Sequence, residues 1–228
     1  MKAVVLLSGG LDSTVCMAVA RSLGFEVYPI SFNYQQRHQR EVECARQVAN
    51  FYKVERHLVI NTNMAEIGGS ALTDSSVGVP DGDVARHDIP VTYVPARNLI
   101  FLGYALGYAE VIGADHIFIG VNALDYSGYP DCRPEFIQLF QDLADYSTKA
   151  GVADGRRIRI EIPLIQLSKK EIVQLGVELE APLALTTSCY RGGESACGKC
   201  DSCLLRLKGF AEAHLTDPIP YATGGAGT

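Results

Sequence analysis

The chain has 228 residues, of which 47% are hydrophobic and 20% are charged, and its formal net charge is −6. These values are typical of one large globular domain, or of a domain with a small appendage, and the acidic balance disfavours a large nucleic-acid footprint. The apolar run at residues 3–7 is too short for a signal-peptide core or a membrane span. We therefore expect a cytoplasmic protein without membrane association, whose seven cysteines are mostly reduced.

Strand and helix patterns alternate along the chain. A β-branched apolar run predicts a strand at 3–7, and helical periodicity predicts a helix at 12–23. The same patterns predict later strands at 26–32, 56–60, 116–121 and 159–162, and helices at 41–52, 98–112, 133–150, 168–175 and 202–214. Residues 61–92 are rich in Gly, Asp and Ser and predict a long, partly mobile excursion, and the tail from residue 216 is expected to fray.

This alternation predicts an α/β fold with a doubly wound parallel sheet of about five strands, covered by helices on both faces. We divide the chain into a nucleotide-binding α/β domain at residues 1–175 and a cysteine-rich, helical C-terminal region at residues 176–228, which could be continuous with it. Ligands of such sheets bind beyond the carboxyl ends of the strands. Polar segments that follow strands are therefore the candidate site.

The first predicted strand leads into the segment Leu7-Ser8-Gly9-Gly10-Leu11-Asp12-Ser13-Thr14. Its two glycines allow close approach of a ligand, and the free N–H groups of the loop and helix start suit phosphates. The hydroxyls of Ser8, Ser13 and Thr14 add donors, and Asp12 would cap the helix or help to hold Mg²⁺. A plain strand-to-helix turn is the alternative, but the flanking Ser and Asp-Ser-Thr residues favour a phosphate loop.

Four cysteines gather near the C-terminus: Cys189, Cys197, Cys200 and Cys203. Two Cys-x-x-Cys steps and four sulfur ligands match a closed tetrahedral zinc site of structural type. The metal would clamp residues 176–201 onto the following helix. An iron–sulfur cluster and a redox-active Cys-x-x-Cys pair are the alternatives.

Two further polar segments lie at predicted strand and helix ends. Tyr34, Arg37 and His38 follow the second strand, where Arg37 could bind a carboxylate or phosphate and His38 could serve as an acid/base or cap a helix. Arg97 and Asn98 begin a helix and could reach an anion, although Asn98 alternatively serves only as an N-cap.

The loop at residues 120–133 is polar and aromatic, which suits a planar heterocycle. Its candidate substrate contacts are Asp125, Tyr129, Asp131 and Arg133. The tyrosine could stack on the ring, and Asp125 or Asp131 could accept N–H bonds from a guanine-like edge. The alternative is that Asp131 caps the next helix and the tyrosines pack.

The segment at residues 8–13 resembles the pyrophosphate loop (PP-loop) of the N-type ATP pyrophosphatases, which include GMP synthetase, NAD synthetase, asparagine synthetase and tRNA thiolation enzymes. Together with residues 36–38, 94–98 and 125–133 and the four cysteines, it resembles the 7-cyano-7-deazaguanine synthase family of queuosine biosynthesis. One departure stands at Gln35, where that family usually has Gly. If the glycine needs a positive φ, the loop carrying Arg37 is shaped differently.

The resemblance implies a carbon–nitrogen ligase that converts 7-carboxy-7-deazaguanine and ammonia into the nitrile through an amide, with ATP, Mg²⁺ and adenylated intermediates. It implies catalytic roles for Asp12, Ser13 and Arg97, nucleotide binding by residues 7–14, zinc at the four cysteines, and a homodimer without a stable nucleic-acid partner. The alternative is a PP-loop tRNA-thiolation enzyme with a reactive cysteine, which would need a basic tRNA-binding face. No such face is obvious in the sequence.

Overall fold

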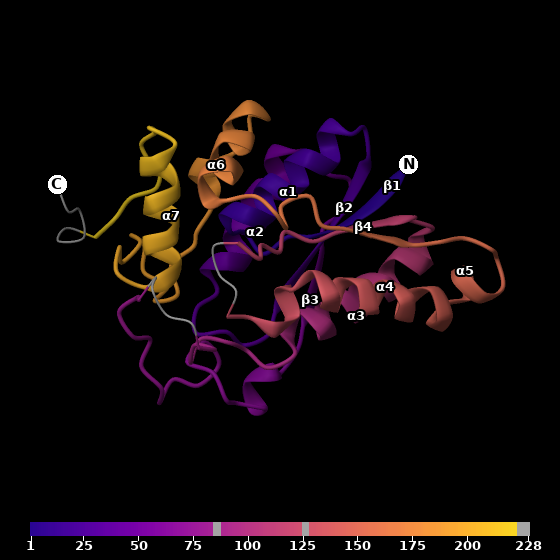
Figure 1. The fold of residues 1–228 in the computed structure, drawn as a ribbon, viewed down its shortest axis with the longest axis horizontal. Coiled ribbons are helices and arrows are strands. Elements are labelled where there is room, and N and C mark those ends of the chain that lie inside the picture. The colour runs from indigo at the N-terminus through magenta and orange to yellow at the C-terminus, as the bar shows by residue number, and fades with distance from the viewer. Residues whose placement is uncertain (84–87, 125–127, 223–228) are drawn as a thin grey trace.

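A five-stranded parallel sheet forms the centre of the protein in the computed structural model, which describes residues 1–83, 88–124 and 128–222 (Figure 1). Its strand order is β3-β2-β1-β4-β5. The strands are β1 Lys2–Leu6, β2 Glu26–Asn33, β3 Leu58–Asn61, β4 His116–Phe118 and β5 Arg159–Glu161. The predicted α/β class, the parallel sheet and its five strands are confirmed.

Helices cover both faces of the sheet (Figure 1). One layer contains α1 Leu11–Ser22, α2 Arg40–Phe51, α6 Lys169–Glu178 and α7 Asp201–Glu212, and the other contains α3 Arg97–Ile112, α4 Pro134–Ser147 and α5 Lys149–Val152. Short 3-10 turns lie at Met64–Glu66, Pro130–Cys132 and Leu183–Leu185. None of the described helices is both long enough and apolar enough to cross a bilayer.

The alternating side chains of β1 supply both cores, as a strand between two helical layers requires. Val4 packs into the core beneath α3 and α4, whereas Val5 packs with α1, α2 and α6 on the opposite face. Phe210 of α7 belongs to this second core, so the C-terminal helix packs on the same hydrophobic cluster as the phosphate-loop helix.

Two predicted helix boundaries were wrong for identifiable reasons. The helix expected at 133–150 is interrupted at Thr148, whose extended backbone and hydroxyl cap α5 by accepting from Gly151 N. The helix expected to end at residue 175 continues to Glu178, because Gly176 serves as a packing position inside it. A Cβ there would lie 2.8 Å from Val15 Cγ2, so glycine allows α6 to approach α1.

The chain from residue 216 to residue 222 is packed against the protein, so the expectation that it frays was wrong for this part. Asp217 accepts two hydrogen bonds from Arg206, at 2.7 and 2.9 Å. Ile219 is buried, and Tyr221 pairs with Ala196 in a parallel bridge. These contacts tie the tail to α7 and to the cysteine-rich segment.

The described part of the excursion at residues 61–92 lies below α7 at the lower left of Figure 1 and is fastened at several points. Ala71 N donates to Val91 O at 2.8 Å, which closes the excursion on itself. Gly82 N donates to Lys199 O at 2.7 Å, so its far end contacts the cysteine-rich segment. Its described residues have little regular structure, as predicted, yet they contact two regions of the fold.

Candidate active site

A cavity of about 280 Å³ opens where β1, β2 and β4 end. It is lined by the segment after β1, the start of α3, the loop after β4 and the residues that precede α7. This is the position that a parallel sheet gives to its ligands. Among the predicted residues, those that line it are Leu7, Ser8, Gly10, Leu11, Asp12, Ser13, Tyr34, Arg97, Asn98 and Tyr129.

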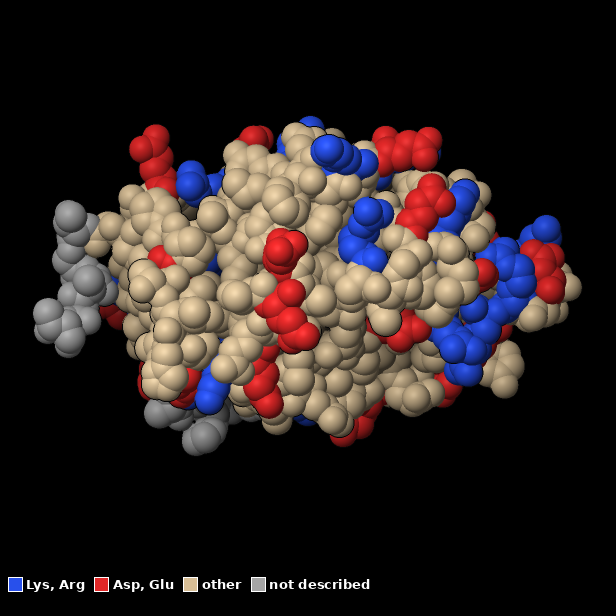
Figure 2. Space-filling model, turned by 90° about the horizontal axis from the view of Figure 1, so that it is seen from above, with Lys and Arg blue, Asp and Glu red and all other residues tan. Residues whose placement is uncertain are grey.

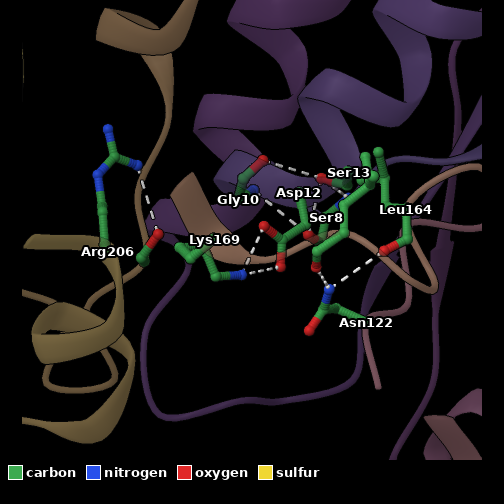
Figure 3. Close-up of polar contacts among 10 residues, drawn as sticks. Ser8, Gly10, Asp12, Ser13, Asn122, Leu164, Lys169 and Arg206 are labelled. Carbon is green, nitrogen blue, oxygen red and sulfur yellow. Dashed lines mark hydrogen bonds and ion pairs between the residues drawn. The ribbon is translucent and has the colours of Figure 1, made fainter. Parts of the chain in front are cut away.

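The hydroxyls of Ser8 and Ser13 hold the predicted phosphate loop in a closed turn (Figure 3). Their Oγ atoms lie 3.0 Å apart, and Ser13 Oγ also donates to Gly10 O at 3.1 Å. Ser8 N donates to Ser13 Oγ at 3.2 Å. Helix α1 begins at Leu11, so its first N–H groups lack partners within the helix and are available to an anion.

Gly9 is required at its position for two reasons. Its φ is +85°, and a Cβ would lie 2.2 Å from Glu41 O in the first turn of α2. Gly9 O also accepts a hydrogen bond from Thr187 N at 3.0 Å. The loop is therefore held between α2 and the segment that leads to the cysteines.

Asp12 forms an ion pair with Lys169, whose Nζ lies 2.8 Å from both carboxylate oxygens (Figure 3). Gly10 is the N-cap residue of α1 and no side chain caps this end, so the alternative cap role for Asp12 was wrong. Lys169 is the first residue of α6 and packs against Gly209, where a Cβ would lie 2.5 Å from Lys169 Cγ. Sequence reasoning missed Lys169, because its only local pattern is the start of a helix.

Arg97 faces the cavity from the start of α3, and its Nη1 donates to the Tyr34 hydroxyl at 3.4 Å. Burial raises the pKa of Tyr34 to about 12, so this hydroxyl stays neutral. Burial opposes the charge of Arg97, but Tyr34 and Tyr129 leave the arginine pKa raised. The wall therefore offers a permanent positive charge to an anionic ligand.

Gln35 adopts a φ of 60°, so the position where the resembling family has glycine does use the left-handed region. A non-glycine residue there costs on the order of 1–2 kcal/mol. The next side chain fixes the turn, because Gln36 Oε1 accepts from Tyr34 N at 2.9 Å. Arg37 Nη2 then donates to Ser75 O at 3.0 Å, on the exposed side of the loop and away from the cavity.

Asn98 and Asp131 form a connected pair at the start of α3. Asn98 N donates to Asp131 Oδ2 at 2.9 Å, and Asn98 Nδ2 donates to Asp131 O at 3.0 Å. Asp131 thus caps α3, not the helix that follows it in sequence, and it does not line the cavity. Asp131 instead orients the side chain of Asn98, and Asn98 lines the cavity.

Tyr129 lies on the cavity wall within a chain of hydroxyls. Its hydroxyl is 3.1 Å from Thr92 Oγ1 and 3.4 Å from the Tyr190 hydroxyl. Thr92 belongs to the excursion and Tyr190 follows Cys189. Three segments far apart in sequence therefore meet at this wall.

Other predicted residues lie elsewhere. His38 packs beneath Gly192, where a Cβ would lie 2.1 Å from its ring, and Arg133 is an exposed residue that precedes α4. Gly9 and Thr14 shape the loop without lining the cavity, and Asp125 lies outside the described residues. The cavity residues that sequence reasoning missed include Glu41, Asn122, Lys169, Thr187, Tyr190 and Arg206.

Arg206 has the largest fully buried side chain among the residues that the structure describes, with 1% exposure. It pairs with Asp217 and donates through Nη1 to Thr186 Oγ1 at 2.7 Å. A buried charge is stable only when it is paired and hydrogen-bonded, and both conditions are met. Because the tail supplies its partner, no pattern near Arg206 in the sequence indicates this role.

The four C-terminal cysteines form one cluster, in which all ligand atoms lie within 4.8 Å of one another. The Sγ atoms of Cys197 and Cys203 are 3.9 Å apart, close to the roughly 3.8 Å that a tetrahedral zinc with Zn–S bonds of about 2.3 Å requires. Cys197 N donates to Cys189 Sγ at 3.3 Å, and Cys200 N donates to Cys197 Sγ at 3.4 Å. The donor set fits a metal ion, which thiolates bind.

The remaining cysteines are poorly suited to nucleophilic chemistry. Burial raises the pKa of Cys16 and of Cys44, and it raises the pKa of Cys132 to about 12. Because the thiolate is the reactive form, burial disfavours nucleophilic reaction at these three thiols. This weighs against a sulfur-carrier role for them.

Charged side chains are dispersed on the face of the protein shown in Figure 2. Lysine and arginine atoms lie among aspartate and glutamate atoms, and the largest basic group, at the right end, is interrupted by acidic residues. A tRNA-binding surface is usually a continuous basic area. This face does not present one.

Comparison with known proteins identifies relatives along nearly the whole chain. The family model described as queuosine biosynthesis protein QueC matches residues 2–214. A 7-cyano-7-deazaguanine synthase from Desulfitobacterium hafniense (strain DSM 10664 / DCB-2) is 63% identical over 224 residues, covering 98% of this chain and 94% of that protein. Another from Acetivibrio thermocellus is 60% identical over 220 residues, covering 96% and 97%.

Solved structures resemble the chain more distantly. NMN synthetase from Francisella tularensis is 19% identical with a TM-score of 0.47, and the match covers 82% of this chain and 65% of that one.

Proposed function

Because this chain belongs to the queuosine biosynthesis protein QueC family, we propose that it is an ATP-dependent 7-cyano-7-deazaguanine synthase, an enzyme that forms carbon–nitrogen bonds. One observation carries the proposal: a single cavity holds the loop residues Ser8 and Ser13 together with Arg97 and Asn98. The residues that we assign to the phosphates and those that we assign to the acid thus line one cavity, as a reaction between ATP and a carboxylic acid requires.

The reaction removes one molecule of water in each of two stages, from acid to amide and from amide to nitrile. An oxygen bound to carbon leaves poorly, and transfer of AMP to that oxygen makes it a good leaving group. The donors at Ser8, Ser13 and the start of α1 would stabilise negative charge on the departing pyrophosphate. Asp12 would help to hold Mg²⁺ at the phosphates, with Lys169 as the second charged group beside them.

Arg97 and Asn98 are the residues that we assign to the acid. The guanidinium of Arg97 would attract the carboxylate, and the amide of Asn98, oriented by Asp131, would fix its direction. Tyr129 supplies an aromatic surface on the same wall for the deazaguanine ring. Arg37 and His38 would contribute only if their loop rearranged.

The cysteine cluster would hold a structural zinc ion, since all four ligands are sulfur and none is left to a substrate. The family resemblance extends the proposal to a cytoplasmic homodimer without stable nucleic-acid partners, and analytical ultracentrifugation of the purified protein tests the oligomeric state.

The test of the function is incubation with 7-carboxy-7-deazaguanine, ATP, Mg²⁺ and ammonium, followed by mass spectrometry of the base. We expect the amide to appear first and then a product that is lighter by one water. Omission of ATP should prevent formation of the nitrile, and so should omission of ammonium. Accumulation of a sulfur-containing product, or no ATP use in the presence of the acid and ammonium, would refute the assignment.

A further inference from the structure

Three carboxylates line the cavity, and two of them are engaged. Asp12 is paired with Lys169, and Asp201 Oδ1 accepts from Asp83 N at 2.7 Å. The third, Glu41, makes no hydrogen bond or ion pair within the described part of the chain. An acidic side chain in a reaction cavity without such a partner is available to exchange a proton.

Glu41 is positioned by the same contact that fixes the phosphate loop. It lies in the first turn of α2, and its carbonyl oxygen fills the space that a Cβ on Gly9 would need. The residue is half-buried and lines the cavity. The backbone of Glu41 therefore adjoins the loop that we assign to the phosphates, and its carboxyl group interacts electrostatically with Arg97, which lines the same cavity.

The charged and titratable groups around Glu41 come from several elements. Burial raises the pKa of its carboxyl, while His38 from the preceding loop and Arg97 from α3 oppose that shift. Cys44, on its own helix, and Tyr34, at the end of β2, also interact with it electrostatically. Because the effect of burial prevails, the pKa of the Glu41 carboxyl lies above that of a free glutamate, and this is the direction that suits a general base.

We propose that Glu41 is the proton acceptor for nitrogen in both stages of the reaction, an inference that rests on the proposed function. The geometry carries it: the side chain shares the cavity with the phosphate loop and Arg97, and it is the lining carboxylate that no described residue holds.

In the first stage, the nitrogen lone pair of ammonia forms a bond to the activated carboxyl carbon. The bond between that carbon and the oxygen of AMP breaks, and its electron pair leaves with AMP. The nitrogen then carries an excess proton, which passes to the Glu41 carboxylate and leaves the neutral amide. When ammonium enters the cavity, the same carboxylate first removes the proton that blocks its lone pair, and it releases that proton to solvent before it accepts the second one.

In the second stage, the amide oxygen carries AMP and the nitrogen must lose both of its protons. Glu41 takes up a proton from nitrogen as the carbon–oxygen bond breaks and AMP leaves with the electron pair. The nitrogen lone pair that is set free completes the triple bond. The other proton is lost to solvent, as is the proton of Glu41 between stages.

The test compares Glu41→Gln with Glu43→Gln. The two substitutions make the same chemical change on one helix, but Glu43 is exposed and accepts only a long 3.5 Å bond from Gln47. Transfer of AMP to the acid is measured by the exchange of labelled pyrophosphate into ATP. The transfer of AMP needs no proton acceptor. Amide and nitrile formation are followed separately by mass spectrometry.

We expect Glu41→Gln to keep pyrophosphate exchange within a few-fold of the wild type and to lose amide formation by roughly 100-fold or more, the usual range for loss of a general base. Glu43→Gln should match the wild type in both. Hydroxylamine, whose nitrogen is unprotonated at neutral pH, should restore attack on the activated acid by Glu41→Gln and give the hydroxamate.

The pH profile gives a second readout. In the wild type, amide formation should fall as pH falls through the Glu41 pKa, because the protonated carboxyl cannot accept a proton. In Glu41→Gln this acid limb should be absent from the residual rate, at unchanged KM for the acid.

Two results would overturn the proposal. Unchanged amide formation in Glu41→Gln would show that another group accepts the proton, and equal loss of exchange and amide formation would make Glu41 a binding residue. Failure of the proposed function itself is distinguishable, because the wild-type protein would then give neither exchange nor nitrile.

Discussion

Replacement of Gly9 by Ala would test how firmly the phosphate loop is held against α2. Gly9 has a φ of +85°, and its new Cβ would lie 2.2 Å from Glu41 O and 2.7 Å from Ala45 N. Gly24 provides a matched control, because its φ is +81° and nothing lies within 4 Å of a Cβ there. The two variants share the conformational cost and differ in the steric contact.

The expected magnitudes follow from these two terms. An alanine in the left-handed region costs roughly 1–2 kcal/mol, and overpacking against fixed backbone adds about 1–3 kcal/mol. Since 1 kcal/mol lowers the Tm of a protein of this size by about 2–4 °C, Gly24→Ala should lose about 2–8 °C and Gly9→Ala about 4–20 °C.

Differential scanning calorimetry measures both shifts, and titration with ATP and Mg²⁺ measures the site. Gly9→Ala should bind ATP at least tenfold more weakly, since the loop must move away from α2, whereas Gly24→Ala should bind as the wild type does. Equal Tm shifts in the two variants, or unchanged ATP binding by Gly9→Ala, would refute the claim that the loop rests on α2.

Four further predictions concern single features of the site and its supports. Asp12→Asn combined with Ser13→Ala should abolish ATP-dependent turnover with an unchanged circular dichroism spectrum, and full activity would disprove the loop assignment. Gln35→Gly should raise Tm, since glycine removes about 1 kcal/mol of left-handed strain; a lower Tm would contradict this. Asp217→Asn leaves a buried guanidinium without its counter-charge and should lower the stability to urea by about 3–5 kcal/mol, whereas a loss below 1 kcal/mol would contradict the pairing. Mass-spectrometric metal analysis should find about one zinc per wild-type chain and little in Cys200→Ser, and iron with visible absorbance would exclude zinc.

The sheet could be predicted because its strands are marked by local patterns. The apolar run at 3–7 differs by one residue at each end from β1, Lys2–Leu6. The helical periodicity at 41–52 likewise differs by one residue at each end from α2, Arg40–Phe51. Boundaries failed where a tertiary contact overrode the local pattern. Gly176 suggests a helix end in the sequence, yet α6 continues through it, and the absence of a side chain there allows Val15 of α1 to approach.

The part of the candidate site that consists of contiguous residues was predicted from the sequence. The part that is assembled from residues far apart in the sequence was missed. The phosphate loop is one continuous segment, so its place on the cavity wall followed from the sequence. Lys169 and Asp12 are 157 positions apart, and no periodicity or motif connects them. Glu41 and Glu43 both lie in the first turn of the amphipathic helix α2, and they differ only in their three-dimensional surroundings, because Glu41 is half-buried and lines the cavity whereas Glu43 is exposed.

The cysteine cluster and the phosphate loop are joined through four consecutive residues of backbone. Thr187 N donates to Gly9 O at 3.0 Å, Cys189 belongs to the cluster, and the Tyr190 hydroxyl lies 3.4 Å from that of Tyr129. A metal ion that fixes Cys189 would therefore also restrict Thr187, which contacts the phosphate loop, and Tyr190, which contacts Tyr129 on the cavity wall. A metal ion bound at the cysteines would thus influence the shape of the cavity without contacting the substrate, because Cys189 lies in sequence between Thr187 and Tyr190.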